Sequence, residues 1–99
     1  MITFVRSWVA QPGKVFDLIG LLKEMSALGS PVTGRTATVA STIGGNFSEA
    51  SLIWEAESLS ESDEAFAKLM AVPGFPALIA KLGTLIVPGM SHEHLYRHA

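Results

Sequence analysis

Residues 33–58 read TGRTATVASTIGGNFSEASLIWEAES, and the pattern of this stretch is typical of a β-hairpin. Its first part, Thr33–Ile43, is rich in Thr, Val and Ala and carries little charge, which favours a β-strand. A Gly-Gly-Asn run at 44–46 follows, a composition typical of tight turns. Ser51–Ser58 then alternates Leu, Trp and Ala with Ile and Glu, as a strand with two different faces does. The stretch therefore predicts two strands joined by a turn.

A strand and a helix are predicted on the N-terminal side of this hairpin. Ile2–Ala10 has the pattern of a strand but no clean polar face, which is typical of a strand covered on both sides. After a turn at Gln11–Lys14, apolar residues recur every three to four positions and predict an amphipathic helix. We expect this helix to stop at Gly29, because glycine often ends helices and Ser30-Pro31 follows it.

Two helical segments and a last strand are predicted on the C-terminal side. Ser60 suits an N-cap, and Asp63 places a negative charge in the first turn, where the helix dipole favours it. Val72–Pro76 should interrupt this helix, and Ala77–Ile86 should form a second helical piece. A Pro-Gly pair ends that piece, and Ser91–Arg97 follows as a strand.

The order of these segments is β-α-β-β-α-β on a chain of 99 residues, which predicts a single ferredoxin-like α+β domain over residues 1–99. In this fold four antiparallel strands carry the helices on one face and leave the other face bare. The predicted core lies between the two layers. We expect it to contain Leu18, Leu22 and Met25 beside Phe66 and Leu69.

The composition indicates that one copy of the chain does not bury all of its apolar surface. Hydrophobic residues make up 48% of the chain, charged residues 16%, and the mean hydropathy is +0.38. This is too apolar for a disordered chain and rather apolar for a small monomer. We therefore expect a two-fold homodimer joined through its sheet faces, with on the order of 1,500 Å² or more buried in total.

Several other classes of protein are disfavoured. The net charge is −2 and Lys and Arg do not cluster, so a nucleic-acid partner is not expected. The chain has no cysteine, which excludes disulfides, thiolate catalysis and cysteine-bound metal. The first residues lack the pattern of a signal peptide, and no apolar run approaches the ~20 residues of a membrane span. We expect a soluble cytoplasmic protein with no membrane partner.

Short motifs distributed along the chain carry a family resemblance. They are Arg6-x-Trp8, Pro12-Gly13-Lys14, Trp54-Glu55-Ala56-Glu57-Ser58-Leu59, Val87-Pro88-Gly89 and Leu95-Tyr96-Arg97. In these the chain resembles the dimeric α+β barrel superfamily and, within it, the NIPSNAP-like group. The resemblance implies a homodimer whose two bare sheet faces pack together and enclose a pocket.

The same resemblance suggests a range of reactions. Relatives use the pocket for cofactor-free oxygenation of quinol-like aromatics, for haem breakdown, or for isomerisation or cyclisation of small rings. The haem-degrading relatives rely on an arrangement of Asn, Trp and His that has no counterpart in the right order here. We therefore expect no cofactor.

His92 and His94 are the predicted catalytic residues. They share one face of the last predicted strand, and imidazole transfers protons near neutral pH. Two imidazoles at this spacing could instead belong to a metal or haem site. A metal would need Glu55 or Glu57 as a third ligand, and we expect no metal. A hydrogen-bonded histidine pair, or a polar C-terminal edge, is the structural alternative.

The predicted ligand-binding residues are Arg6, Trp8, Trp54 and Tyr96. Arg6 would hold an oxyanion or a carboxylate, or else form a salt bridge across strands or at the dimer seam. The three aromatic side chains would stack on a flat ligand, or else belong to the core.

Strand parity predicts that these residues converge. Even-numbered residues share one face of a strand, so we expect the row Phe4–Arg6–Trp8 to face the barrel interior. By the same rule the row His92–His94–Tyr96 should face it too. Three functions remain open for a protein with this predicted fold. They are an enzyme resembling a monooxygenase, isomerase or cyclase that acts on an aromatic or polyketide-like molecule, a small-molecule binding or sensing module, and a purely structural dimer.

Overall fold

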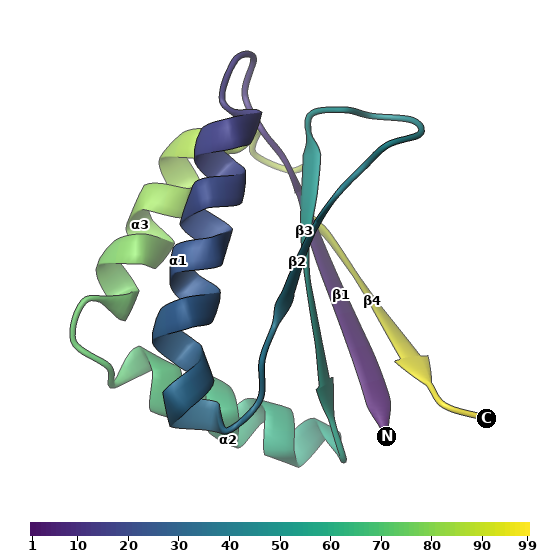
Figure 1. The fold of residues 1–99 in the computed structure, drawn as a ribbon, viewed down its shortest axis with the longest axis vertical. Helices are drawn as coiled ribbons and strands as arrows, with labels where there is room; N and C mark the ends of the chain where they lie inside the picture. Colours follow the sequence, from purple (N-terminus) through teal and green to yellow (C-terminus); the bar gives the residue numbers. More distant parts are fainter.

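Four strands form one antiparallel sheet in the order β2-β3-β1-β4, and three helices cover one of its faces (Figure 1). The computed structural model describes all residues, Met1–Ala99. Its elements are β1 (Ile2–Val9), α1 (Val15–Thr33), β2 (Thr38–Ser41), β3 (Glu49–Ala56), α2 (Leu59–Met70), α3 (Phe75–Leu85) and β4 (His92–Arg97). This is the predicted ferredoxin-like α+β fold, with the second helical segment divided into α2 and α3.

The central hairpin is confirmed, with a shorter first strand than predicted. β2 covers only residues 38–41 of the expected Thr33–Ile43. Thr33 is the last residue of α1, and residues 34–37 connect the helix to the strand. β3 begins at Glu49 and pairs antiparallel with β2, so that Val39 lies opposite Leu52. In the turn, Gly45 has φ 92°, a conformation that favours glycine.

α1 does not stop at Gly29, so that prediction was wrong. The helix continues through Pro31 and ends where Gly34 adopts φ 73° and its N–H donates to the carbonyl of Ser30. Pro31 has no backbone N–H, so α1 loses one hydrogen bond there. Because Pro31 lies in the last turn, this loss does not end the helix. Gly29 is instead a buried contact with α2, because an added Cβ would lie 2.8 Å from a methyl carbon of Leu69.

α2 begins two residues earlier than predicted, and its cap is Ser58 rather than Ser60. The Ser58 side chain accepts a hydrogen bond from the backbone N–H of Glu61. α3 begins at Phe75, directly after Gly74 in a left-handed conformation. No single helix is long and apolar enough to span a membrane, and α2 and α3 reach that length only as a pair bent by 99°.

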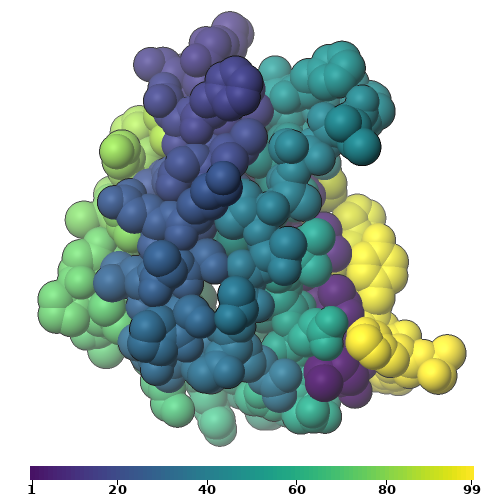
Figure 2. Space-filling model, viewed as in Figure 1, coloured from purple at the N-terminus to yellow at the C-terminus, as the bar shows by residue number.

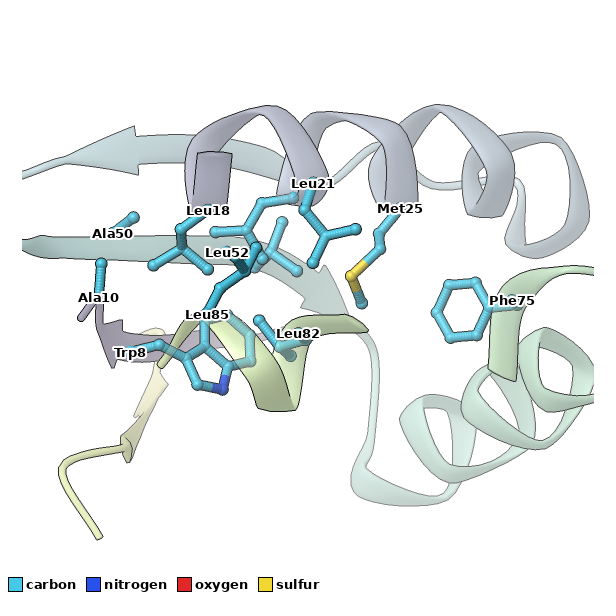
Figure 3. Close-up of a cluster of buried hydrophobic side chains, with 11 residues drawn as sticks. Trp8, Ala10, Leu18, Leu21, Met25, Ala50, Leu52, Phe75, Leu82 and Leu85 are labelled. Atoms are coloured by element: carbon cyan, nitrogen blue, oxygen red, sulfur yellow. The ribbon is translucent and has the colours of Figure 1, made fainter. Parts of the chain in front are cut away.

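The core lies between the sheet and the pair α1 and α3 (Figure 3). Leu18 and Leu22 are fully buried and Met25 is buried, as predicted. Leu69 packs against the edge of this cluster. The prediction for Phe66 was wrong, since its side chain is 54% exposed. α2 runs across the end of the helical layer, as Figure 1 shows, and none of its residues is fully covered.

Candidate functional site

A cavity of about 440 Å³ lies between the helix-covered face of the sheet and the helices. Strands β1 and β3 form one wall, and α1, α2 and α3 form the others. Its aromatic lining consists of Phe4, Trp8, Trp54, Phe66 and Phe75. The space-filling view has a narrow opening between the blue atoms of α1 and the blue-green atoms that follow it (Figure 2).

Two parallel rings form the flat part of the sheet-side wall. Phe4 and Trp54 lie directly opposite each other on β1 and β3, so their side chains share the helix-facing side. Their rings stack with centroids 5.3 Å apart and planes only 3° from parallel. The indole N–H of Trp54 donates to the hydroxyl of Ser62 at 3.4 Å, which helps to hold this ring in place. A planar apolar ligand could lie against this wall.

Arg6 brings a positive charge to the same face of the sheet. Its guanidinium carbon lies 6.0 Å from the centroid of the Trp8 ring, within reach of a cation–π contact. It also forms a loose ion pair with Glu93, whose oxygen lies 3.8 Å from an Arg6 nitrogen. The Arg6 side chain is 51% exposed, so it is not a buried cation and can turn toward a bound molecule. The cross-strand salt bridge considered from the sequence is therefore present.

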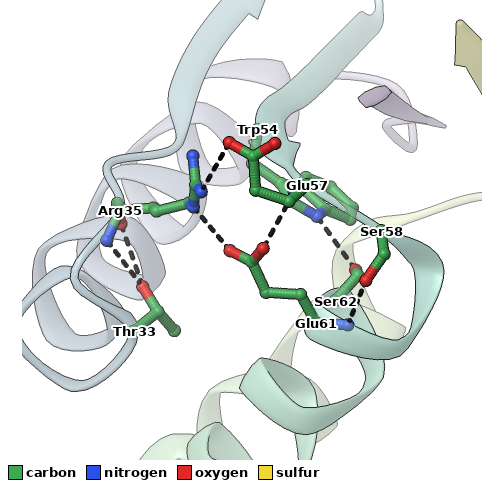
Figure 4. A network of polar contacts seen from close by, with 7 residues as sticks. All are labelled: Thr33, Arg35, Trp54, Glu57, Ser58, Glu61 and Ser62. Atoms are coloured by element: carbon green, nitrogen blue, oxygen red, sulfur yellow. Dashed lines mark hydrogen bonds and ion pairs between the residues drawn. The ribbon is translucent and has the colours of Figure 1, made fainter. Parts of the chain in front are cut away.

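A network around Arg35 and Glu61 lies at another part of the cavity lining (Figure 4). The Nε of Arg35 donates to a Glu61 oxygen at 2.8 Å, and a second Arg35 nitrogen lies 3.7 Å from the Glu57 carboxylate. The other Glu61 oxygen accepts the backbone N–H of Glu57 at 2.9 Å. These contacts tie the segment after α1 to the start of α2. Glu61 is not among the residues predicted from the sequence, although Ser58-x-x-Glu61 has the spacing of a capping box.

The pKa of Glu61 is lowered, chiefly by the hydrogen bond from the Glu57 backbone and further by the Arg35 guanidinium, with partial burial opposing the shift. A lowered pKa means that the charged form stabilises the fold at neutral pH, and that this contribution is lost as the pH falls through the folded-state pKa. The relevant window lies below 4.5, the ordinary value of this carboxyl.

We therefore expect Glu61→Gln to be less stable than the wild type at pH 7, with a difference that shrinks as the pH is lowered from about 5 toward 3. Urea-unfolding midpoints measured at each pH would test this. Glu64→Gln, an exposed residue of the same helix without an ion pair, is the matched control. A Glu61→Gln difference that does not change with pH would contradict the ion pair.

His92, His94 and Tyr96 lie on the opposite face of the sheet from Arg6. The register of β1 and β4 places Arg6 opposite Glu93 and Val5 opposite His94. Residues directly opposite each other share a face, so even-numbered residues of β1 face the same way as odd-numbered residues of β4. The prediction of one common patch was therefore wrong. The expectation that the row Phe4–Arg6–Trp8 faces the interior of a barrel between two bare sheet faces was wrong too, because this row lies on the helix-covered face. Arg6, Trp8 and Trp54 line the helix-side cavity, whereas the histidine row is on the bare face.

On the bare face the histidine row forms a chain of ring contacts. The rings of His92 and His94 meet edge to face with centroids 5.3 Å apart, and His94 and Tyr96 are 6.3 Å apart at 20°. His92 lies 3.8 Å from the carboxylate of Glu49. No three His, Asp or Glu side chains converge as metal ligands would, and Glu57 pairs with Arg35 instead. The proton-transfer role of the two histidines stays a prediction, and it would require a substrate on the bare face.

Neither a family model nor a curated protein matches this sequence. Solved structures do match its fold. A NIPSNAP family protein from Agrobacterium tumefaciens has a TM-score of 0.84 at 24% identity, covering 99% of this chain and 92% of that one. A NIPSNAP domain protein from Burkholderia xenovorans has a TM-score of 0.82 at 13% identity, covering 100% and 95%.

A candidate antibiotic biosynthesis monooxygenase from Deinococcus radiodurans has a TM-score of 0.72 at 16% identity, covering 100% of this chain and 93% of that one. At identities of 13–24%, the similarity to these three structures shows the fold alone. The resemblance to NIPSNAP-like proteins is thus confirmed at the level of the fold, over essentially the whole chain.

Proposed function

We propose that this protein binds a flat, mainly apolar small molecule in the cavity between its sheet and its helices. The observation that carries the proposal is a space of about 440 Å³ with an aromatic wall and one available guanidinium. Small-molecule sites commonly have this size and this mixture of apolar lining with a few polar groups. A purely structural dimer has no need of such a space.

The charges around the cavity favour a neutral ligand. Arg35 is already engaged by two carboxylates, so Arg6 is the lining guanidinium best placed to meet a ligand oxygen. Four acidic and three basic side chains line the cavity, a formal balance of −1 that disfavours a ligand of high negative charge. They are Glu61, Asp63, Glu64 and Glu93 against Arg6, Arg35 and Lys68, since Glu55 alternates with Trp54 and its side chain lies on the bare face. A phenol, quinone or enone oxygen directed at Arg6 fits this balance.

We further propose that two copies associate through their bare sheet faces. Val5 and Ile53 are only half-buried on this face, and the six residues of β4 are all exposed in the single chain. Ser7 is 2% exposed and shares a 2.6 Å hydrogen bond with Ser51, so the centre of this face is already closed to water. A second sheet would cover the half-buried apolar residues around it.

The reaction proposed for the site is cofactor-free oxygenation, isomerisation or cyclisation of an aromatic or polyketide-like molecule. Arg6 would stabilise a developing oxyanion. The structural likeness to the candidate monooxygenase supports this class of chemistry through the fold. One observation favours a second candidate, a binding or sensing module without turnover. The cavity lining contains no histidine, the side chain most often used for proton transfer near neutral pH.

Quenching of tryptophan fluorescence by menadione or naphthol tests the proposed site, because both tryptophans line the cavity. We expect both probes to bind the wild type, and Arg6→Ala to weaken binding about tenfold, the equivalent of one charge-assisted hydrogen bond. His94→Ala is the discriminating variant and should bind as the wild type does. Weakening by His94→Ala alone would move the site to the bare face, and an absence of binding to the wild type would refute the proposal.

A further inference from the structure

We propose that Gly29 and Leu69 together set the size of the molecule that the cavity admits, an inference that rests on the proposed function. Both residues line the cavity, Gly29 from α1 and Leu69 from α2. They meet where these two helices approach each other. Ligand selection by size would thus depend on a contact between helices rather than on the aromatic wall.

The backbone of α1 gives no reason for a glycine at position 29. Gly29 lies inside a helix and does not have a positive φ, so another residue could adopt its conformation. Glycine in a helix interior is also destabilising relative to alanine. The glycine is explained by the lack of room for a side chain, since a Cβ added at this position would lie 2.8 Å from Leu69 Cδ2. The other close atoms, both at 3.9 Å, also belong to Leu69.

Leu69 is a movable part of the cavity wall. Its side chain is half-buried against the edge of the core, and no residue of α2 is fully buried. A methyl group at position 29 would push the end of the Leu69 side chain away from α1. Because that side chain lines the cavity, the displacement would take up space that a ligand would otherwise occupy. The absence of a side chain at Gly29 therefore keeps this part of the cavity open.

α1 also contains a matched control. Gly20 lies in the same helix, and a Cβ added there would have nothing within 4 Å. Gly20→Ala therefore makes the same chemical change without a contact, and it separates the local clash from the general effect of alanine on the helix. Leu69→Ala removes the side chain that is pushed, so in combination with Gly29→Ala it should restore the space.

Fluorescence titration with naphthol, which has two rings, and phenanthrol, which has three, tests the inference. We expect Gly29→Ala to weaken phenanthrol binding several-fold while changing naphthol binding much less, because the longer ligand extends further into the space beside Leu69. The double variant Gly29→Ala/Leu69→Ala should recover phenanthrol binding, and Gly20→Ala should bind both probes as the wild type does.

Equal weakening of both probes by Gly29→Ala, or no recovery in the double variant, would overturn the inference and leave the proposed function standing. If Gly29→Ala does not fold, as judged by circular dichroism, Leu69→Ala alone decides. It should shift the preference toward phenanthrol, and an unchanged ratio of affinities would refute the role of Leu69. If neither probe binds the wild type, the proposed function fails and the size selection fails with it.

Discussion

Leu22→Ala is expected to lower the free energy of unfolding by about 2–5 kcal/mol. Leu22 lies in the middle of α1 and its side chain is completely buried between this helix and the sheet. Truncation removes apolar contacts and leaves a space that the surrounding side chains fill only in part. Urea or guanidinium denaturation measures the loss, at one fixed protein concentration because association would also contribute to stability.

Phe16→Ala is the control for this measurement. Phe16 lies in the first turn of α1, but its side chain is 83% exposed, so its removal should change stability by no more than about 0.5 kcal/mol. The pair separates burial from the effect of truncating a large apolar side chain in the same helix. A loss below about 0.5 kcal/mol for Leu22→Ala would mean that the buried face of α1 is wrongly assigned.

Val5→Arg is expected to convert the proposed homodimer to a monomer. Val5 lies in β1, next to the centre of the sheet, and its side chain is on the bare face between Ile53 and His94. A guanidinium placed between two packed sheets would lose its water, a cost of several kcal/mol that the neighbouring carboxylate of Glu55 offsets only in part. Light scattering at micromolar concentration should give twice the chain mass of 10.5 kDa for the wild type and the single mass for the variant.

Ala27→Arg adds the same charge at an exposed position of α1, on the helix-covered side of the sheet, and should leave the dimer intact. Circular dichroism would establish that Val5→Arg is folded before its mass is interpreted. A wild type that is monomeric at micromolar concentration would refute the dimer outright. A dimer that tolerates Val5→Arg would place the interface somewhere other than the bare sheet face.

Part of the candidate site could be predicted from the sequence. Residue type and strand position predict that Arg6, Trp8 and Trp54 line one pocket, and they do line one cavity. That cavity lies on the helix-covered side of the sheet, whereas the prediction placed the pocket between two bare sheet faces. The contribution of α2 was not predicted, because Glu61 reaches Arg35 only when the start of α2 lies beside the segment after α1. Phe66 was assigned to the core from its helical spacing, but α2 crosses the end of the layer and leaves this residue half exposed.

The order of the elements, the hairpin at the Gly-Gly-Asn turn and the buried face of α1 can be predicted from the amino-acid sequence. These features depend on residues a few positions apart, whose relation is set by the backbone geometry of a helix, strand or turn. Which rows of side chains share a face of the sheet follows only from the pairing of the strands in the folded chain. Parity relates residues within one strand, whereas the β1–β4 register depends on how residues almost a full chain length apart align in the sheet. That alignment puts Arg6 on the side of the cavity and His94 on the bare face. Gly29 shows the same limit, since it looks locally like a helix end and acts as a contact because Leu69 packs against it.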